Sequence, residues 1–234
     1  MGCCMRWTKS LLFGVVVALS ACTDEPVSDL PQIYVGFPSS IDPQCRAGSA
    51  KMFDECGDQL ELFNAALARA NAEGKVLLVE IGAEWCIWCH VFDAHINGDR
   101  GRFRYTYGAP EEPDVRDSRT FTEPAGPAMD AADALREFVA THFVVAHIDI
   151  QHAPRSDEVL ELSGAVDRFR DAVPFVYVVD SRGIFVSEFD HDAVEKRRDT
   201  GDWYRGYDRI GLLEQLKAMH EVAAAANRPA ASET

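Results

Sequence analysis

The chain has 234 residues, of which 47% are hydrophobic and 26% charged, so it can build one domain with its own core but is short for two. Its 13 Phe, 4 Trp and 6 Tyr exclude an intrinsically disordered chain. The 38 acidic residues outnumber the 23 basic ones and give a formal net charge of −15. Because such a surface repels phosphate backbones, we do not expect the protein to bind nucleic acid.

Residues 1–21 have the pattern of a secretory signal peptide, with Arg6 and Lys9 before an apolar run that is too short to span a bilayer. The sequence Leu-Ser-Ala-Cys that ends at Cys22 resembles the lipobox of bacterial lipoproteins, in which the cysteine is lipidated and becomes the first residue of the mature chain. The alternative is an ordinary signal peptide followed by a chance cysteine.

A lipid on Cys22 would hold the protein on a membrane of the bacterial cell envelope, facing the periplasm, without a spanning helix. An Asp directly after the lipidated cysteine would favour retention in the inner membrane. This chain has Thr23 there, so the outer membrane is favoured. Residues 22–57 would then form a lipidated tether and lead-in segment. Loss of the signal peptide removes two basic residues and no acid, so the mature charge becomes 21 − 38 = −17.

The pattern after the tether predicts a helix, a strand and a second helix. Asp58 can cap the first helix, and Gly74 can end it. The run 75–81 is apolar except for Glu80 and predicts a strand that is buried on both faces. The second helix is expected over residues 86–97.

Residues 98–127 show no regular pattern and contain many Arg, Asp, Gly and Pro, so we expect a long surface insertion. The following pattern predicts, in chain order, a helix over 130–141, a strand over 143–150, a helix over 156–170, a strand over 173–179, a turn at 180–183, a strand over 184–189 and a helix over 210–225. Residues 227–234 are expected to be a disordered tail. This order predicts a mixed sheet covered by helices on both faces.

Cys86 and Cys89 are the chemical centre of the sequence, because they follow the buried strand and open a helix. At a helix N-terminus, free N–H groups and the helix dipole would stabilise a Cys86 thiolate. Cys89 lies one turn later and can close a disulfide with it. The outer thiolate would attack a substrate disulfide, and the inner one would resolve the mixed disulfide.

The segment Val-Glu-Ile-Gly-Ala-Glu-Trp-Cys-Ile-Trp-Cys, residues 79–89, resembles the active-site segment of the thioredoxin superfamily. The resemblance extends over most of residues 58–226, apart from the insertion. It implies an α/β fold with a thioredoxin-like mixed sheet flanked by helices and an insertion after the active-site helix. It also implies a thiol:disulfide oxidoreductase that needs no cofactor and no metal, with Cys86 as nucleophile and Cys89 as resolving thiol.

The resemblance gives roles to further positions. Glu80 stands where the family carries a buried acid behind the inner cysteine, so it would carry a proton for Cys89. Val173 and Pro174 stand at the place of the family's cis-proline, where the Val173 backbone would pair with an extended substrate peptide. His147 stands where thioredoxin has a lysine near the buried acid.

Each of these positions also has a structural alternative. Glu80 could face water on an edge strand, Pro174 could be a trans proline at a strand start, and His147 could be a plain strand residue. Trp85 is expected to shield the disulfide and to contact the substrate, whereas Trp88 could equally be helix packing.

The pair Cys86 and Cys89 also allows other interpretations. It could be a structural disulfide or half of a zinc site, although the sequence offers no second close cysteine pair. With His90 it matches the pattern for attachment of a c-type haem, with His90 as axial ligand and a residue such as Met129 as distal ligand. The preceding apolar strand argues against haem, because small cytochromes of that type are mostly helical.

The seven cysteines divide into Cys3 and Cys4 of the signal peptide, the lipidated cysteine, the central pair, and Cys45 with Cys56. A disulfide between the last two would brace the lead-in segment and stabilise it by roughly 2–3 kcal/mol. The alternative is a second redox pair that exchanges with the first.

The sequence therefore predicts a membrane-anchored, extracytoplasmic thiol:disulfide oxidoreductase. The residues between the cysteines favour a reductase or isomerase, because the strong oxidants of the family usually carry Pro-His there. Its partners would be extracytoplasmic proteins with disulfides and a membrane redox partner that supplies electrons.

The alternative function is a non-catalytic binding or chaperone-like module of the cell envelope. Its partner surface would be the insertion, which carries basic and aromatic side chains in an otherwise acidic protein: Arg100, Arg102, Phe103, Arg104, Tyr105 and Tyr107. A solvated loop is the simpler interpretation of the same segment.

Overall fold

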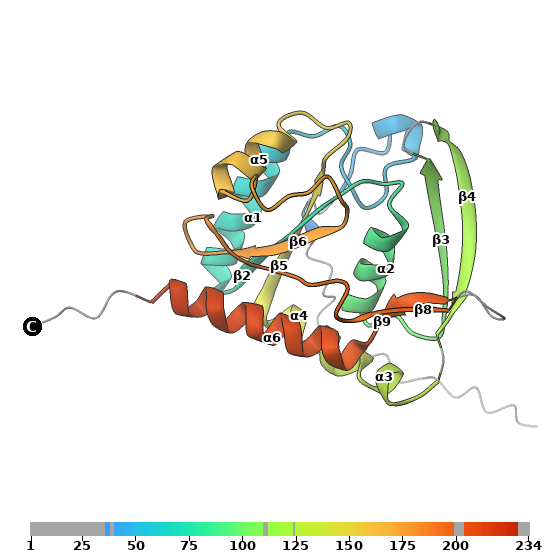
Figure 1. Cartoon of the computed structure of the whole chain (residues 1–234). Helices are drawn as coiled ribbons and strands as arrows, with labels where there is room; N and C mark the ends of the chain where they lie inside the picture. Colours follow the sequence, from blue (N-terminus) through green and yellow to red (C-terminus); the bar gives the residue numbers. More distant parts are fainter. Residues whose placement is uncertain (1–35, 38–39, 110–111, 124, 199–203, 229–234) are drawn as a thin grey trace, which may run out of the picture.

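The computed structural model describes residues 36–37, 40–109, 112–123, 125–198 and 204–228 (Figure 1). The predicted signal peptide, Cys22 and most of the tether lie outside the described residues, as do residues 229–234 of the predicted tail. Within the described part, no helix is both long enough and apolar enough to cross a membrane.

A five-stranded mixed sheet forms the centre of the fold, in the order β1 (Gly36–Phe37), β5 (Phe143–Asp149), β2 (Val76–Gly82), β6 (Phe175–Val179) and β7 (Phe185–Glu188). Strand β5 runs parallel to β1 and β2, whereas β6 runs antiparallel to β2 and β7. This order and these directions confirm the thioredoxin-like mixed sheet that the sequence predicts.

Helices cover both faces of this sheet (Figure 1): α1 (Gln59–Glu73) and α5 (Ser156–Ser163) on one face, and α2 (Ile87–Ile96), α4 (Ala132–His142) and α6 (Arg209–Ala226) on the other. Every residue of β2 is buried as a result. Because strand side chains alternate between faces, Leu77 and Val79 pack with α1 and α5, whereas Val76 and Leu78 pack with the other three helices.

The ends of the helices follow from local chemistry. The Oδ1 atom of Asp58 accepts a hydrogen bond of 2.9 Å from the Glu61 N–H and caps α1, and Gly74 ends the helix in the left-handed region at φ 67°. The helix predicted over residues 156–170 ends earlier, at Ser163. There Gly164 adopts φ 71° and closes α5, because glycine takes this conformation without steric strain.

The insertion is an ordered β-hairpin followed by a short helix, which corrects the expectation of a segment without regular pattern. Strand β3 (Arg102–Ala109) pairs antiparallel with β4 (Glu112–Thr122), and α3 (Pro127–Asp130) follows. Residues 102–107 alternate between polar or basic and aromatic side chains, which is the period of a strand. Phe103 and Tyr105 are buried against the core around α2, whereas Arg102 and Arg104 are exposed. The predicted basic and aromatic surface is therefore not continuous.

A buried ion pair holds the base of this hairpin. The Arg209 side chain at the start of α6 is fully buried, and its Nε and Nη2 donate to the two carboxylate oxygens of Glu123 at 2.8 and 3.0 Å. Its guanidinium also donates to the backbone oxygens of His95 and Asp99. One side chain thus joins the hairpin, the end of α2 and the start of α6.

Two further elements have no counterpart in the elements expected from the sequence. A small antiparallel hairpin, β8 (Glu195–Arg198) and β9 (Tyr204–Tyr207), packs beside α2. A short 3-10 helix, η1 (Cys45–Gly48), lies in the lead-in segment. In Figure 1 the β8–β9 hairpin lies beside the lower end of α2.

We expect the substitution Glu123→Ala to lower the free energy of unfolding by about 3–5 kcal/mol, because it leaves the Arg209 charge buried without its partner. Urea unfolding measures this change. The matched control is Asp133→Ala, which breaks an exposed ion pair with Arg100 and should cost less than about 1 kcal/mol. Equal effects of the two substitutions would contradict the role given to the buried pair.

Candidate active site

Cys86 and Cys89 form a disulfide at the start of α2, with 5.3 Å between their Cα atoms. Cys86 is the residue that caps the helix, and its Sγ accepts a hydrogen bond of 3.1 Å from the Cys89 N–H. In the reduced protein the same N–H and the helix dipole would stabilise a Cys86 thiolate. Cys86 is 3% exposed and Cys89 is 0% exposed, so only the outer cysteine retains any accessible surface.

The lead-in segment, residues 40–57, packs directly on this disulfide. Met52 and Phe53 share a buried cluster with both cysteines, and the partly buried side chains of Trp85, Trp88 and Val173 pack around it. A Cβ atom at Gly82 would overlap the Phe53 ring and would lie 2.8 Å from the Cys89 Sγ. Phe53 and Cys89 therefore meet at a point where only glycine fits.

Glu84 holds the lead-in segment in place. This carboxylate is 3% exposed, and its Oε2 accepts hydrogen bonds from the backbone N–H groups of Met52 and Phe53 at 3.0 and 3.1 Å. Cys45 and Cys56 form the second disulfide, with 5.8 Å between their Cα atoms, and close the segment on itself. The structure thus contains the bracing disulfide that the sequence suggested.

A second buried carboxylate lies under the disulfide. Glu80 on β2 is fully buried, and its Oε2 is 3.0 Å from Nδ1 of His147, the residue beside it on β5. The other ring nitrogen of His147 is 3.4 Å from Oδ1 of Asp93 on α2. Asp93 follows Cys89 by four residues, so both side chains lie on one face of the helix. The structure therefore places an acid–histidine–acid cluster one turn below the inner cysteine.

Glu80 and His147 bind protons more tightly than the free groups would, because the pKa of each is raised. Burial raises the pKa of Glu80, and the hydrogen bond and charge of His147 oppose part of this rise. Burial lowers the pKa of His147, but the hydrogen bonds and charges of Asp93 and Glu80 outweigh it and raise this pKa to about 10. The Phe53 ring stands edge-on to the His147 ring, with 5.5 Å between centroids, and also packs against the two cysteines.

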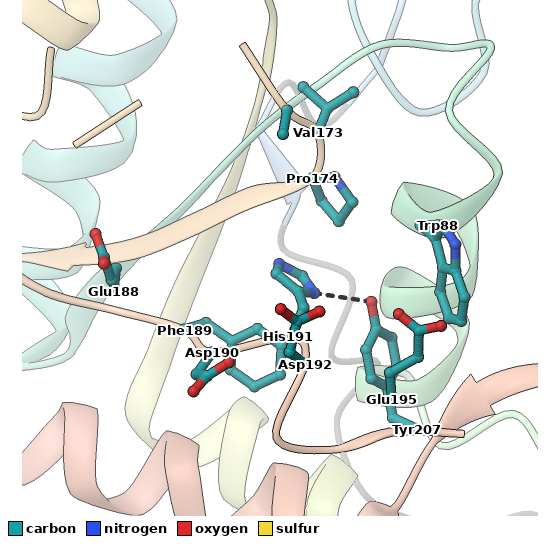
Figure 2. A pocket seen from close by; sticks show the side chains of 11 residues that line it. Trp88, Val173, Pro174, Glu188, Phe189, Asp190, His191, Asp192, Glu195 and Tyr207 are labelled. Atoms are coloured by element: carbon teal, nitrogen blue, oxygen red, sulfur yellow. Dashed lines mark hydrogen bonds between the residues drawn. The ribbon is translucent and has the colours of Figure 1, made fainter. Parts of the chain in front are cut away.

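The peptide bond between Val173 and Pro174 is cis, as the resemblance implied. The bond precedes β6, and Val173 packs against the cluster that contains the two cysteines. Figure 2 shows Pro174 beside a pocket of about 420 Å³, with Trp88 of α2 on one side and His191 below. The Nδ1 atom of His191 is 3.0 Å from the hydroxyl oxygen of Tyr207.

The residues do not fit two of the other interpretations of the cysteines, haem attachment and a zinc site. Haem attachment needs both sulfurs as thioether links, but Cys86 and Cys89 are bonded to each other, and Nε2 of His90 donates to the Glu84 backbone oxygen at 2.8 Å. Met129, the suggested distal ligand, lies on α3, which packs against α4 and α6. The sulfurs of the second disulfide lie near a carboxylate of Asp54, but their mutual bond leaves neither as a zinc ligand.

Several residues of the site are not among those expected from the sequence. Asp93 could have been found, because a residue four positions after Cys89 shares its helix face. The sequence also offered a reason to examine Glu84, because an acidic residue between the apolar residues Ala83 and Trp85 is unusual. No sequence pattern pointed to Phe53 or to the His191–Tyr207 pair, since only tertiary contacts bring them to the site.

No model of a protein family matches the chain, and no curated protein matches it. Among solved structures, the chain is similar to the disulphide isomerase from Xylella fastidiosa Temecula1, with 21% identity over 73% of this chain and 88% of that chain. The TM-score is 0.33, a level of similarity that carries no argument about activity. The assignment of the fold therefore rests on the order and the directions of the strands in the central sheet.

The proton held by the cluster predicts a pH dependence of stability. Folding raises the pKa of His147, so the protonated ring stabilises the folded state. This contribution to the free energy of unfolding is complete below the ordinary pKa of histidine and is lost as the pH rises towards about 10. The raised pKa of Glu80 acts in the same direction. We expect the free energy of unfolding of the oxidised protein to fall between about pH 7 and about pH 10, by at most about 1.4 kcal/mol per pH unit for one proton.

Urea unfolding at several pH values measures this slope. The control is the double variant Glu80→Gln with His147→Gln, in which neither side chain titrates, and its slope should be shallower over the same range. If the variant loses stability with pH as steeply as the parent protein, the cluster does not hold the proton.

Proposed function

We propose that the protein is a thiol:disulfide oxidoreductase that acts on protein disulfides, with Cys86 as nucleophile and Cys89 as resolving thiol. The observation that carries this proposal is the Cys86–Cys89 disulfide at the N-terminus of α2, packed against the residue before a cis-proline. The outer sulfur lies where helix N–H groups stabilise a thiolate, and the inner one lies where no solvent reaches it.

In the reducing direction, the Cys86 thiolate attacks one sulfur of a substrate disulfide. A bond forms between Cys86 and that sulfur, and the other substrate sulfur leaves as a thiolate. The Cys89 thiolate then attacks the Cys86 Sγ, so that the Cys86–Cys89 bond forms and the second substrate thiolate leaves. The substrate gains two electrons, the protein loses two, and an external dithiol must return them.

The buried cluster supports the second step. Cys89 must lose its proton before it can attack, and Asp93 lies one helical turn away on the same face of α2. Asp93, His147 and Glu80 form a chain of close contacts through which this proton can be taken up. We therefore assign Glu80 to proton transfer rather than to substrate contact.

The backbone before Pro174 supports recognition of polypeptides. Val173 is not part of a strand, and it packs against the disulfide cluster, so an extended substrate could pair with its backbone beside Cys86. The partly buried ring of Trp85 packs against the same cluster. Both residues would then contact the chain that carries the substrate disulfide.

The proposal also covers the direction of the redox reaction and the location of the protein in the cell. A reductase or isomerase is favoured over an oxidase by Ile87 and Trp88 between the cysteines and by the buried acid cluster. Lipidation at Cys22 would place the protein on the periplasmic side of the bacterial envelope, with the outer membrane favoured. The substrates would be extracytoplasmic proteins, and a membrane redox partner would supply the electrons.

We expect Cys86→Ser to abolish reduction of insulin with dithiothreitol as donor, because no thiolate remains to attack. Cys89→Ala should leave Cys86 in stable mixed disulfides, which can be identified after non-reducing electrophoresis. If Cys86→Ser is as active as the parent protein and Cys89→Ala traps nothing, the chain is not an oxidoreductase of this kind, and a non-catalytic binding module becomes the better interpretation.

The double variant Cys45→Ser with Cys56→Ser tests the second disulfide. If this disulfide is structural, the variant still traps substrates when combined with Cys89→Ala, and its free energy of unfolding falls by roughly 2–3 kcal/mol. If the variant stays folded but loses all turnover, the second pair takes part in electron exchange.

A further inference from the structure

We propose that the pocket beside Pro174 binds a lysine or arginine side chain of the substrate polypeptide, close to the disulfide that is reduced. This inference rests on the proposed function and adds a substrate preference to it. The pocket has a volume of about 420 Å³ and lies between the cis-proline, Trp88 of α2 and the segment that leads from β7 into β8. It therefore adjoins the backbone on which an extended substrate would lie (Figure 2).

The rim of the pocket carries negative charge that the protein leaves uncompensated. Four carboxylates line it, and one of them, Glu188, is paired with Arg168 at 2.6 Å. Asp190, Asp192 and Glu195 form no ion pair with any side chain that the structure describes. A cationic group in the pocket would therefore find three carboxylates without an ion pair, of which Asp190 already accepts a hydrogen bond of 3.3 Å from the Ala193 N–H.

Two basic residues near the pocket, Lys196 and Arg205, have side chains that the structure describes, and both are engaged elsewhere. Lys196, next to Glu195 in the chain, forms an ion pair of 3.3 Å with Asp208. Arg205 on β9 lies over the Trp88 ring, with 5.4 Å between the guanidinium carbon and the ring centroid, and it does not line the pocket. Neither of these two basic side chains fills the pocket.

The inner part of the pocket is neutral and partly apolar. Burial lowers the pKa of His191 to about 4, against the opposing effect of Asp192 and Asp190, so the ring is uncharged at neutral pH. Its Nδ1 is engaged with the Tyr207 hydroxyl. Trp88, Val173 and Phe189 supply apolar walls. Apolar walls below an acidic rim suit a side chain with an aliphatic stem and a cationic head.

The occupant is a side chain of the substrate because of where the pocket lies. Val173 and Pro174 belong both to its lining and to the backbone beside the disulfide cluster. A residue a short distance from the substrate cysteine would reach the pocket while the cysteine meets Cys86. The carboxylates would speed the encounter and lower the dissociation rate of such a substrate.

The test uses the reduced full-length protein and short peptide disulfides that differ at one position near the cysteine, with Lys, Gln or Glu there. Stopped-flow fluorescence of Trp85 and Trp88 follows a single turnover without an external donor. We expect the Lys peptide to react about fivefold to tenfold faster than the Glu peptide, with the Gln peptide between them. We expect the ratio of Lys to Glu rates to fall towards one in the double variant Asp192→Asn with Glu195→Gln, and to a smaller extent in Asp192→Asn alone.

The control is the double variant Asp157→Asn with Glu161→Gln, which removes two exposed carboxylates from α5 on the other side of the sheet. This control changes the net charge by the same amount as the pocket double variant. It should keep the ratio of Lys-peptide to Glu-peptide rates seen with the parent protein. Equal rates for the three peptides, or the same loss of preference in the control, would overturn the pocket assignment and leave the oxidoreductase proposal intact. Failure of the parent protein to react with any of the peptides would instead refute the oxidoreductase proposal.

Discussion

The position of the helix that begins at Cys86 depends on three titratable side chains between that helix and the sheet, two of them fully buried and the third, Asp93, partly buried. Glu80, His147 and Asp93 come from β2, β5 and α2, and each would be costly to bury without the others. A shift of β2 against β5 by one residue would turn Glu80 away from His147. The register of the two central strands and the orientation of α2 are therefore tied together, and the cysteine pair above them has its place fixed.

The surroundings of the disulfide come from parts of the chain that lie far apart in the sequence. The lead-in segment brings Phe53 onto Cys89 through the carboxylate of Glu84, and the loop before β6 brings Val173. The β8–β9 hairpin adds Tyr207 to the pocket on the other side. The central sheet and α2 position the two cysteines, and these additions surround them.

Local patterns were sufficient for the elements that carry the chemistry. The apolar run of β2, the cap at Asp58 and the placement of Cys86 after a strand were readable because each depends on neighbours in the sequence. The cis bond before Pro174 was accessible only through resemblance. Three features were not predicted from the sequence. A single glycine, Gly164, ends α5, and tertiary packing determines hairpin β8–β9 and the position of Phe53. The strand period of residues 102–107 was present in the sequence and was overlooked.

The disulfide between Cys45 and Cys56 also determines how the molecule bears mechanical load. A pull on the chain before Cys45 passes through the covalent sulfur bridge into Cys56 and on towards α1. The ten residues between them, Phe53 included, are bypassed by that force. The side chain that packs on the inner cysteine is thus insulated from tension on the N-terminal part of the chain.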